Sequence, residues 1–465
     1  MQPRLLLSLV FTFLHGASIA RAEEPNSPLL PIGAAVVDIT PEYPIRLAGY
    51  ASRTKESEGV VNKLRAHALA IGDDTTGDGP ALIITVDNVS VASSITDEVA
   101  ANLKTKRGVK RERIAICASH THSGPFLSTA SDTLLGELPA VHVEHIQRYT
   151  RELTLAIENV ALKALDARSP GRLAWGQGHV GFAGNRRILR DGRWVGFGLN
   201  PNGPVDQSLP ILSVTDPGGK PRAIVFGYTC HCTCMPGEFN QICGDWAGFA
   251  CEEIEAQNPG ALALAVIGCA GDSGPQPAGK VEDARRHGAE IAKEVARLLK
   301  TSLKPLSGKI AARSRQIELP LQAAPTKAEL EPRTKKPGSE GYFARKLIAQ
   351  LDRGEPLAKS IPYPVSTWCF DGDLAMVFLA GEVVIDYALR LKWEIDANRL
   401  WISAYTNDAR CYVASRRVLN EGGYEADFSM VLYGQPAKLA PEAEDLLIRT
   451  VHDLLPPPFD EPRKP

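Results

Sequence analysis

Short apolar runs that read as β-strands alternate with helical segments along most of the chain, and this alternation constrains the fold most. Strand-like runs lie at 33–39, 81–87, 223–228, 261–267 and 374–379, and helical patterns at 95–106, 142–167, 247–257, 284–299 and 383–395. Several runs are apolar at nearly every position, which is typical of strands buried on both faces. The pattern predicts an α/β fold in which one or more mixed, buried sheets are flanked by helices in a single large domain. A polar, Pro/Lys-rich stretch at 325–337 is predicted to be a surface loop.

The two ends of the sequence differ in composition from the region between them. Met1-Gln2-Pro3-Arg4, an apolar run from Leu5 to Leu14 and an Ala20-Arg21-Ala22 site indicate a signal peptide over residues 1–22. A Pro-rich segment follows at 23–31, and a Pro-rich tail is expected at 457–465. We therefore expect a periplasmic or secreted protein whose folded domain covers residues 32–456.

The composition excludes two classes of partner. The 465 residues carry a formal net charge of −2, so the chain has no basic field with which to bind nucleic acid. After the leader, no apolar run reaches the ~18 residues of a membrane-spanning helix. The sequence thus predicts neither a nucleic-acid-binding protein nor a transmembrane segment.

One strand-like run, residues 113–118, leads directly into a polar segment with two histidines. The sequence there is Ala118-Ser119-His120-Thr121-His122-Ser123-Gly124-Pro125. If strand geometry continues beyond Ala118, the side-chain period of two points His120 and His122 to the same side. Both imidazoles could then line a pocket, one as a metal ligand and the other free for acid-base chemistry. The alternative is that they are ordinary polar residues at the end of a strand.

Polar residues also follow other apolar runs. His231 comes after the run at 223–228, and Glu382 comes after the run at 374–379. Two histidines and one carboxylate are a common ligand set for catalytic zinc, which polarises a carbonyl and acidifies its bound water. His120, His231 and Glu382 could form such a set if the strand ends converge, which spacing alone does not establish.

The nine cysteines leave at least one without an intramolecular partner. Cys230, Cys232 and Cys234 alternate along one apparent strand, which predicts three sulfurs on one face and His231 on the other. A thiolate cluster that includes His231 is therefore disfavoured. We interpret these cysteines as small buried apolar residues, with a disulfide to Cys243 or Cys251 as an option.

Several motifs, taken in order, resemble the neutral, non-lysosomal ceramidase family. That family carries a His-Thr-His-Ser-Gly-Pro motif, which residues 120–125 match. The further matches span nearly all of the mature chain: Asp38-Ile39-Thr40-Pro41, Gly49-Tyr50, Asn185-Arg186, His231, Gly381-Glu382, Tyr412 and Gly423-Tyr424-Glu425.

The resemblance implies a zinc-dependent amidohydrolase that cleaves an N-acyl amide, such as a ceramide-like lipid, through zinc-bound hydroxide. The family's zinc ligands fall on His120, His231, Glu382 and Tyr412. Its other site residues fall on His122, Arg186 and Tyr424. The implied roles are general acid-base catalysis for His122 and stabilisation of the oxyanion for Arg186 or Tyr424. Without the resemblance, Arg186 reads as a solvated charge and Tyr424 as a turn residue.

The chain departs from the family in two places. Where ceramidases have Gly-Asp-Val-Ser-Pro, this chain has Gly271-Asp272-Ser273-Gly274-Pro275, so Gly274 replaces the family's serine and Ser273 inherits no role. The sequence also stops soon after the matched region, where typical ceramidases continue into a β-sandwich domain. We therefore expect only the catalytic domain, and ceramide itself is not an assured substrate.

Three other functions are compatible with parts of the sequence. One is a zinc hydrolase for a different acylated substrate, such as an acyl sugar, and another is a non-catalytic zinc-stabilised binding protein. The string at 271–275 also occurs in the nucleophile loop of chymotrypsin-like proteases, but those proteins are all-β and need a histidine in its own context. The α/β pattern argues against that interpretation.

Overall fold

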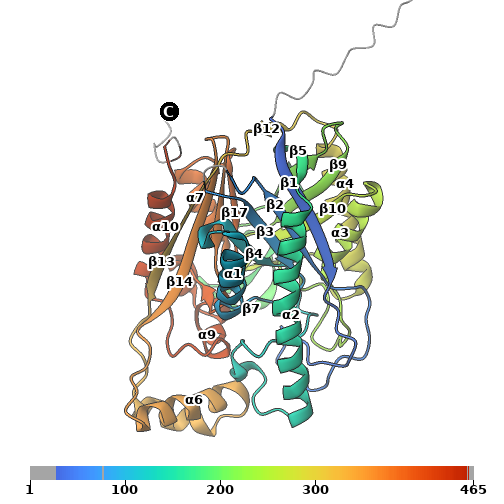
Figure 1. Cartoon of the computed structure of the whole chain (residues 1–465). Coiled ribbons are helices and arrows are strands. Elements are labelled where there is room, and N and C mark those ends of the chain that lie inside the picture. The colour runs from blue at the N-terminus through green and yellow to red at the C-terminus, as the bar shows by residue number, and fades with distance from the viewer. Residues whose placement is uncertain (1–27, 76–77, 458, 460–465) are drawn as a thin grey trace, which may run out of the picture.

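The computed structural model describes residues 28–75, 78–457 and 459. The predicted signal peptide at 1–22 and most of the predicted tail lie outside the described residues. A large mixed sheet runs through the middle of the molecule (Figure 1) in the order β10-β9-β8-β5-β1-β2-β3-β4, with β12 also pairing with β5. Its strands are β1 (Leu30–Asp38), β2 (Arg65–Ile71), β3 (Ala81–Val86), β4 (Ile114–Ala118), β5 (Ser169–His179), β8 (Ser208–Thr215), β9 (Pro221–Tyr228), β10 (Leu262–Ile267) and β12 (Lys304–Leu306).

Parallel pairs stand at both ends of this sheet, and antiparallel pairs fill its middle. β3 and β4 are parallel and are joined through α1 (Ser93–Arg107), while β9 and β10 are parallel and are joined through α3 (Asp245–Gln257). Parallel strands need such a crossover, and a helix usually provides it. The two crossovers account for the alternation of strand and helix that the sequence displays.

A second sheet packs against the large one. It has four strands in the order β13-β14-β15-β17, with bounds Ile310–Pro320, Ser360–Phe370, Leu374–Leu379 and Leu400–Ser403. An inner apolar cluster is shared by the two sheets and includes Ile83, Leu212, Val225, Trp368, Met376 and Trp401. The two sheets therefore enclose one common core.

Helices cover the outer faces of both sheets (Figure 1). α1, α2 (Ala140–Asp166), α3 and α4 (Val281–Leu298) pack on the large sheet, and α7 (Ile385–Glu394) and α10 (Glu442–Leu454) belong to the side of the four-stranded sheet. Along β3, Ala81 and Ile83 face the inner cluster, whereas Leu82, Ile84 and Val86 face the helices. Both faces of the strand are buried, which explains its unbroken apolar sequence. The predicted mixed α/β fold is confirmed.

The helix α1 shows how local sequence sets an element's limits. Gly108 caps its C-terminus in the left-handed region at φ 68°, and its N–H donates to the carbonyl of Lys104. Glycine adopts that conformation at little cost, and the basic side chains in the last turn complement the helix dipole. At the other end, the N–H of Ser93 donates to Asp408 Oδ1 at 3.0 Å. A distant residue thus ties the start of α1 to the loop that follows β17.

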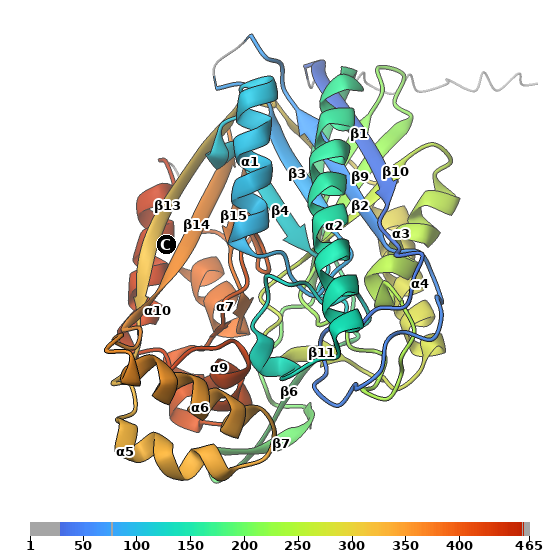
Figure 2. The ribbon, with the colours of Figure 1, turned by 60° about the horizontal axis from the view of Figure 1, so that its bottom comes forward.

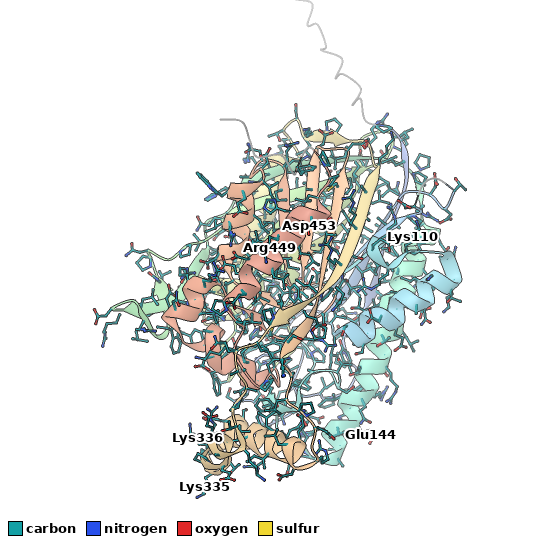
Figure 3. All side chains as sticks on the ribbon, turned by 90° about the vertical axis from the view of Figure 1, so that its left-hand side faces the viewer. Lys110, Glu144, Lys335, Lys336, Arg449 and Asp453 are labelled. Atoms are coloured by element: carbon teal, nitrogen blue, oxygen red, sulfur yellow. The ribbon has the colours of Figure 1, made fainter. Side chains whose placement is uncertain are left out.

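The segment predicted as a surface loop at 325–337 is on the surface but is partly helical. It contains α5 (Lys327–Leu330), capped by Thr326 and Glu329 in a capping box, and a 3-10 helix, Glu331–Lys335. Figure 3 shows Lys335 and Lys336 directed outward there. The Pro/Lys composition concealed the cap, and α6 (Gly338–Asp352), which follows at once, was not predicted.

Two small sheets and several short helices complete the chain. β6 (Ala183–Arg190) and β7 (Arg193–Asn200) form a hairpin that joins β11 (Ser273–Pro275), and β16 (Glu382–Val383) pairs in parallel with β18 (Tyr412–Val413). In Figure 2, β6 and β7 lie at the bottom of the molecule. α8 (Arg416–Glu421), a π-helical turn (Tyr424–Phe428) and α9 (Ser429–Leu432) lie between β18 and α10. Among the described residues, no helix is long and apolar enough to cross a membrane.

Candidate active site

The carboxyl ends of strands from both sheets meet at one place and are joined by backbone hydrogen bonds. The N–H of Ala118, the last residue of β4, donates to the carbonyl of Tyr405 at 3.0 Å. The N–H of Ala404 donates to Ile267 at the end of β10, and Gly268 donates to Tyr228 at the end of β9. The polar residues that follow these strands are therefore brought to a common centre.

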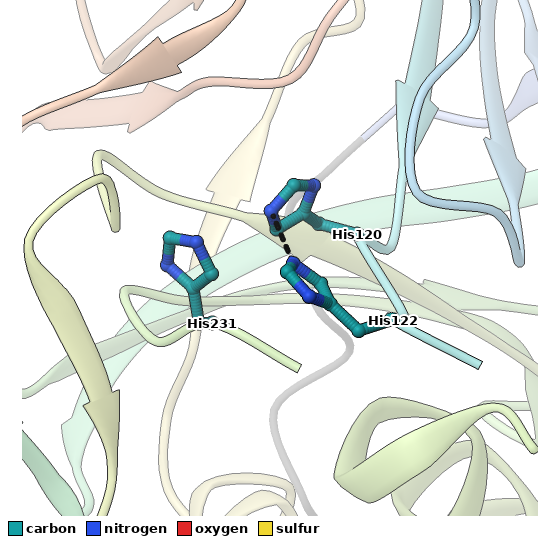
Figure 4. A group of neighbouring side chains, drawn as sticks. All are labelled: His120, His122 and His231. Atoms are coloured by element: carbon teal, nitrogen blue, oxygen red, sulfur yellow. Dashed lines mark hydrogen bonds between the residues drawn. The ribbon is translucent and has the colours of Figure 1, made fainter. Parts of the chain in front are cut away.

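His120 and His122 meet here, but not for the reason that the sequence suggested. β4 ends at Ala118, and His120 has a left-handed backbone with φ 58°, so strand geometry does not continue through the motif. Instead, Thr121 forms an isolated bridge with Cys232, and the N–H of His122 donates to the carbonyl of Cys232. Because of this turn, the Nε2 atoms of the two rings lie 3.1 Å apart (Figure 4).

His231 and Glu382 complete the centre. Glu382 Oε2 lies 3.1 Å from His120 Nε2 and 3.0 Å from His231 Nε2. The parallel pairing of β16 and β18 sets Glu382 directly opposite Tyr412, whose hydroxyl is 3.4 Å from His231 Nε2. Gly381 precedes Glu382 at φ 69°, and a Cβ there would lie 2.5 Å from the carbonyl oxygen of Cys411. Glycine is therefore required for the close approach that positions Glu382.

Two of the three histidines are anchored by backbone carbonyls. His120 Nδ1 lies 2.7 Å from the oxygen of Val89, and His231 Nδ1 lies 2.6 Å from the oxygen of Ala270. A carbonyl only accepts, so both Nδ1 atoms carry the proton and both Nε2 atoms present a lone pair in the neutral ring. An outer hydrogen bond of this kind is the usual support of a metal-ligating histidine.

The charge states are consistent with that arrangement. Burial lowers the pKa of His231 to about 3, with the Arg186 charge acting in the same direction. Burial also lowers the pKa of His122 well below its usual value, and His120 and His231 add to the effect. Burial therefore keeps the rings of His122 and His231 uncharged.

These residues fit a metal ion. Glu382 Oε2 is buried without a hydrogen-bond donor among the described residues, and it faces two Nε2 lone pairs at about 3 Å. Acceptors held that close repel one another unless a cation lies between them. His120, His122 and His231 also offer nitrogen atoms within 4.8 Å of one another. A metal can be held here, and His122 differs from the other two histidines because its Nδ1 has no partner in the described structure.

Arg186 and Tyr424 lie beside this centre. Arg186 Nη2 donates to the hydroxyl of Tyr412 at 3.0 Å, and its Nε donates to Glu425 at 3.0 Å. Burial lowers the pKa of Arg186, but Tyr412 and Glu425 outweigh it and raise the pKa well above its usual value. The rings of Tyr412 and Tyr424 lie 5.4 Å apart. All seven residues singled out in the sequence are thus brought together, and Arg186 is not a solvated surface charge.

Two tyrosines of the site were missed by the sequence reasoning. The hydroxyl of Tyr433 donates to Glu382 Oε1, and the ring of Tyr405 lies 4.3 Å from the ring of His120. Tyr433 follows a short helix with no motif around it, so no local signal could have identified it. Glu425 was noted only as a neighbour of Tyr424, yet it binds both Arg186 and Arg187.

The Gly49-Tyr50 pair has a physical role at this centre. A Cβ on Gly49 would lie 2.5 Å from Cγ of His122, so only glycine leaves room for that ring. The ring of Tyr50 contacts His122 edge-on at 5.0 Å, and its hydroxyl donates to the carbonyl of Met235. Both residues hold the His122 ring in place.

A cavity of about 740 Å³ opens onto the centre. Its lining includes His122, Glu382, Tyr412, Tyr424 and Tyr433 at the centre and Phe343 from α6. This volume is in the range of small-molecule binding sites. The helix that the sequence did not predict therefore provides part of the cavity wall.

Ser273 and the nine cysteines have contacts typical of structural residues. Ser273 Oγ donates to the carbonyl of Thr229, and a Cβ at Gly274 would meet only Thr233 Oγ1, at 4.0 Å. β9 ends at Tyr228, so the predicted strand through Cys230, Cys232 and Cys234 is wrong; the chain there is irregular because it turns into the site. All nine cysteines are buried and free, so the optional disulfide to Cys243 or Cys251 is not formed and the apolar interpretation is confirmed.

Comparison with known proteins adds family and fold to this geometry. The sequence profile of the family described as "Neutral/alkaline non-lysosomal ceramidase, N-terminal" matches residues 30–266. The solved neutral ceramidase of Pseudomonas aeruginosa is similar in fold, with TM-score 0.70 and 18% identity over 92% of this chain and 74% of that chain. A solved ceramidase complexed with C2 has TM-score 0.72 and 17% identity, covering 94% of this chain and 77% of that one. No curated protein matches this chain in sequence.

The matched region contains β4, the histidine motif, Arg186 and His231, and the fold is shared over more than nine-tenths of the chain. The chain therefore belongs to the neutral/alkaline non-lysosomal ceramidase family.

Proposed function

We propose that this protein is a zinc-dependent amidohydrolase that cleaves an N-acyl amide, with a ceramide-like lipid or a related N-acyl compound as substrate. One observation carries the proposal. The unprotonated Nε2 atoms of His120 and His231 face the Glu382 carboxylate at 3.1 and 3.0 Å. Membership of the ceramidase family supports the choice of an amide bond.

The proposed ligands are His120, His231, Glu382 and Tyr412. Two imidazoles and a carboxylate are a ligand set that favours zinc, and Tyr412 Oη stands 3.4 Å from His231 Nε2. When bound there, zinc supplies a Lewis acid that polarises the amide carbonyl and lowers the pKa of water. The carbonyl anchors on His120 and His231 keep their Nε2 atoms available for the ion.

The remaining residues would move the proton and hold the substrate. His122 has an unpartnered, buried Nδ1 and a lowered pKa, so it is a neutral base that can take the proton of the attacking water. It then gives that proton to the amine as the C–N bond breaks. Tyr424 lines the cavity and Arg186 donates to the hydroxyl of Tyr412, which also lines it; both would donate to the carbonyl oxygen as charge develops on it.

One observation favours a second candidate substrate, an acylated sugar. Hydroxyl side chains contribute to the cavity wall, among them Ser90, Ser93, Ser94, Ser128 and Thr129. Such a wall can bond to a substrate with several hydroxyl groups. The chemistry at the centre would be the same for either acyl compound.

We also propose that residues 32–456 act as one catalytic domain and that the protein is exported to the periplasm or secreted. The N-terminal pattern of a basic start, an apolar run and an Ala-Arg-Ala site supports export. N-terminal sequencing of the protein recovered from the periplasm or medium is expected to begin at Glu23. A mature protein that begins at Met1 would contradict this part of the proposal.

The test compares metal content and hydrolysis in the wild type, His120→Ala and a control. His452→Ala is a matched control because His452 also pairs with a glutamate, Glu394, at 2.9 Å but lies outside the cavity lining. We expect stoichiometric zinc and turnover of an N-acyl lipid or acyl sugar in the wild type and in His452→Ala, and loss of both in His120→Ala. Bound zinc without turnover on any acyl substrate would favour a zinc-stabilised binding protein instead.

A further inference from the structure

Arg53 is a buried arginine beside the candidate active site, at a position that no sequence motif includes. It is 4% exposed, and no carboxylate of the described residues pairs with it. Its partners are backbone carbonyls: Nε donates to Phe239 at 3.1 Å, and Nη1 donates to Ala48 at 2.7 Å and to His122. Arginine is rarely buried in proteins unless an anion pairs with it. The cost of burying this cation must therefore be offset by what its donors hold in place.

The guanidinium keeps its charge in this environment. Burial lowers the pKa of Arg53 to about 10, with Tyr50 acting in the opposite direction. Arg53 is therefore protonated at neutral pH, and its N–H groups remain donors. Its guanidinium carbon lies 4.9 Å from the centre of the Tyr50 ring, in a cation–π contact. This contact restrains the plane of the guanidinium and with it the direction of the donated bonds.

His122 lacks the anchor that the other two histidines have. His120 and His231 each donate from Nδ1 to a backbone carbonyl, whereas Nδ1 of His122 is buried without a partner among the described residues. Its Nε2 faces Nε2 of His120, which is proposed to bind the metal. A ring without a hydrogen-bonded anchor is oriented by its side-chain torsions and by packing. The main chain of His122 and its neighbours must therefore set the position of the ring.

Arg53 holds each of the parts that set this position. Its bond to the carbonyl of His122 restrains the main chain of the histidine itself. Its bond to the carbonyl of Ala48 restrains the residue before Gly49, where a Cβ would lie 2.5 Å from Cγ of the ring. Its contact with Tyr50 restrains the aromatic ring that meets His122 edge-on. One side chain thus joins three contacts that confine the imidazole.

We propose that Arg53 is a positioning residue that holds the His122 imidazole in place for proton transfer. The inference rests on the proposed function, because the acid-base role of His122 belongs to that proposal. Arg53 is not part of the cavity lining, and its hydrogen bonds reach none of the proposed zinc ligands. It therefore acts through His122, and zinc binding is expected to be independent of it.

The activity test compares Arg53→Met with the matched control Arg113→Met. Arg113 is also 4% exposed and also donates to backbone carbonyls, those of Pro80 and Ile310, but it precedes β4, whereas the histidine motif follows it. We expect Arg53→Met to keep its zinc and to lose about 100-fold in kcat with KM little changed, as for a displaced reacting group. Arg113→Met is expected to keep the wild-type kcat. Arg53→Lys retains a cation but not the planar fork, so it should restore part of the loss.

Three results of this test would overturn the inference. They are a wild-type kcat in Arg53→Met, equal losses of kcat in Arg53→Met and Arg113→Met, and loss of zinc from Arg53→Met. If Arg53→Met does not fold, Arg53→Lys takes its place, with an expected loss in kcat of about tenfold. A wild-type kcat in Arg53→Lys would then overturn the inference.

A second readout needs neither substrate nor metal. NMR spectra of the metal-free protein, labelled at histidine Cε1, report the surroundings of each imidazole, and the His122 signal is identified by its loss in His122→Asn. In Arg53→Met we expect this signal to shift or broaden while that of His452 on α10 stays unchanged, and in Arg113→Met neither should move. An unchanged His122 signal in Arg53→Met would overturn the inference. A displaced signal in a protein that hydrolyses no N-acyl compound supports the positioning role and contradicts the proposed function.

Discussion

At the scale of single residues, the site depends on close approaches that permit no alternative side chain. Gly49 leaves room for the His122 ring, and Gly381 lets Glu382 pass the carbonyl of Cys411. The hydroxyl of Tyr433 donates to Glu382 Oε1, and the other carboxylate oxygen, Oε2, faces His120 and His231. These neighbours determine where the chemically active atoms lie.

Replacing Gly49 by alanine is expected to move His122 without removing the metal site. The new Cβ would lie 2.5 Å from His122 Cγ, and Gly49 has φ 92°, which an alanine adopts under strain. Misplacing a reacting group by about 1 Å can lower activity about 100-fold. We expect a loss of that order in kcat with zinc content retained. Gly192→Ala is the control, because Gly192 also has positive φ but open space around it; equal losses in both variants would contradict the role of Gly49.

Replacing Tyr433 by phenylalanine is expected to weaken zinc binding. The change removes the hydroxyl that donates to Glu382 Oε1 and leaves the ring, so the carboxylate loses its outer support. Such losses typically reduce metal affinity by about 10- to 100-fold, which competition with a chromogenic chelator measures. Tyr342→Phe, which breaks a tyrosine–aspartate bond of 3.0 Å on α6, should leave the affinity unchanged. An unchanged affinity in Tyr433→Phe would show that Glu382 needs no support from this hydroxyl.

At the scale of elements, the site is assembled by the connections after strands. The connection from β10 to β11 contains Asp272, whose Oδ1 accepts the N–H of Ile385 at the start of α7. Its Oδ2 accepts from Asn185 at 3.1 Å and from Arg417 at 3.2 Å. One buried carboxyl thus joins the hairpin that carries Arg186 to the segment that follows Glu382.

Asp272 also predicts a pH dependence of stability. Burial raises its pKa from 3.8 to about 6, with Asp386 and Glu425 acting in the same direction and Arg417 against it. Because the folded state holds this proton more tightly than the unfolded chain, the contribution is fully present below pH ~4 and is lost as the pH rises through about 6. The shift corresponds to about 3 kcal/mol at most.

The measurement is chemical unfolding of the metal-free wild type and Asp272→Asn between pH 4 and 7. An asparagine stays neutral, so the stability of Asp272→Asn relative to the wild type is expected to increase from pH 4 to pH 6 and then to level off. A difference that is constant with pH would mean that Asp272 ionises in the folded protein as it does in the unfolded chain.

At the scale of the whole molecule, two sheets and their covering helices contribute to a single centre. His120 and His231 come from the large sheet, whereas Glu382 and Tyr412 follow strands of the second sheet and its extension. A metal held by all four would link these two halves of the fold. Anything that binds only the folded state stabilises it by mass action.

Zinc is therefore expected to raise the thermal unfolding midpoint of the metal-free protein. At a free zinc concentration of about 100 times Kd, the added stability is about 2.7 kcal/mol. Differential scanning calorimetry of chelator-treated protein, with and without added zinc, measures the effect. His452→Ala should respond as the wild type does and His120→Ala should not; a zinc response that survives in His120→Ala would place the ion elsewhere.

The sequence by itself determined the fold class and the candidate residues. Strands buried on both faces must be apolar throughout and crossovers between parallel strands need helices, so β3, β9, α1 and α3 could be recognised locally. The motifs around His120, His231, Glu382 and Tyr424 indicated a family and hence a chemistry.

Only the tertiary structure decided how those residues meet. The turn at His120, the helix α6 and the hydroxyl of Tyr433 depend on contacts between segments far apart in the chain, such as Thr121 with Cys232 and Glu382 with Tyr412. Periodicity reports which face of an element is buried but not which element covers it.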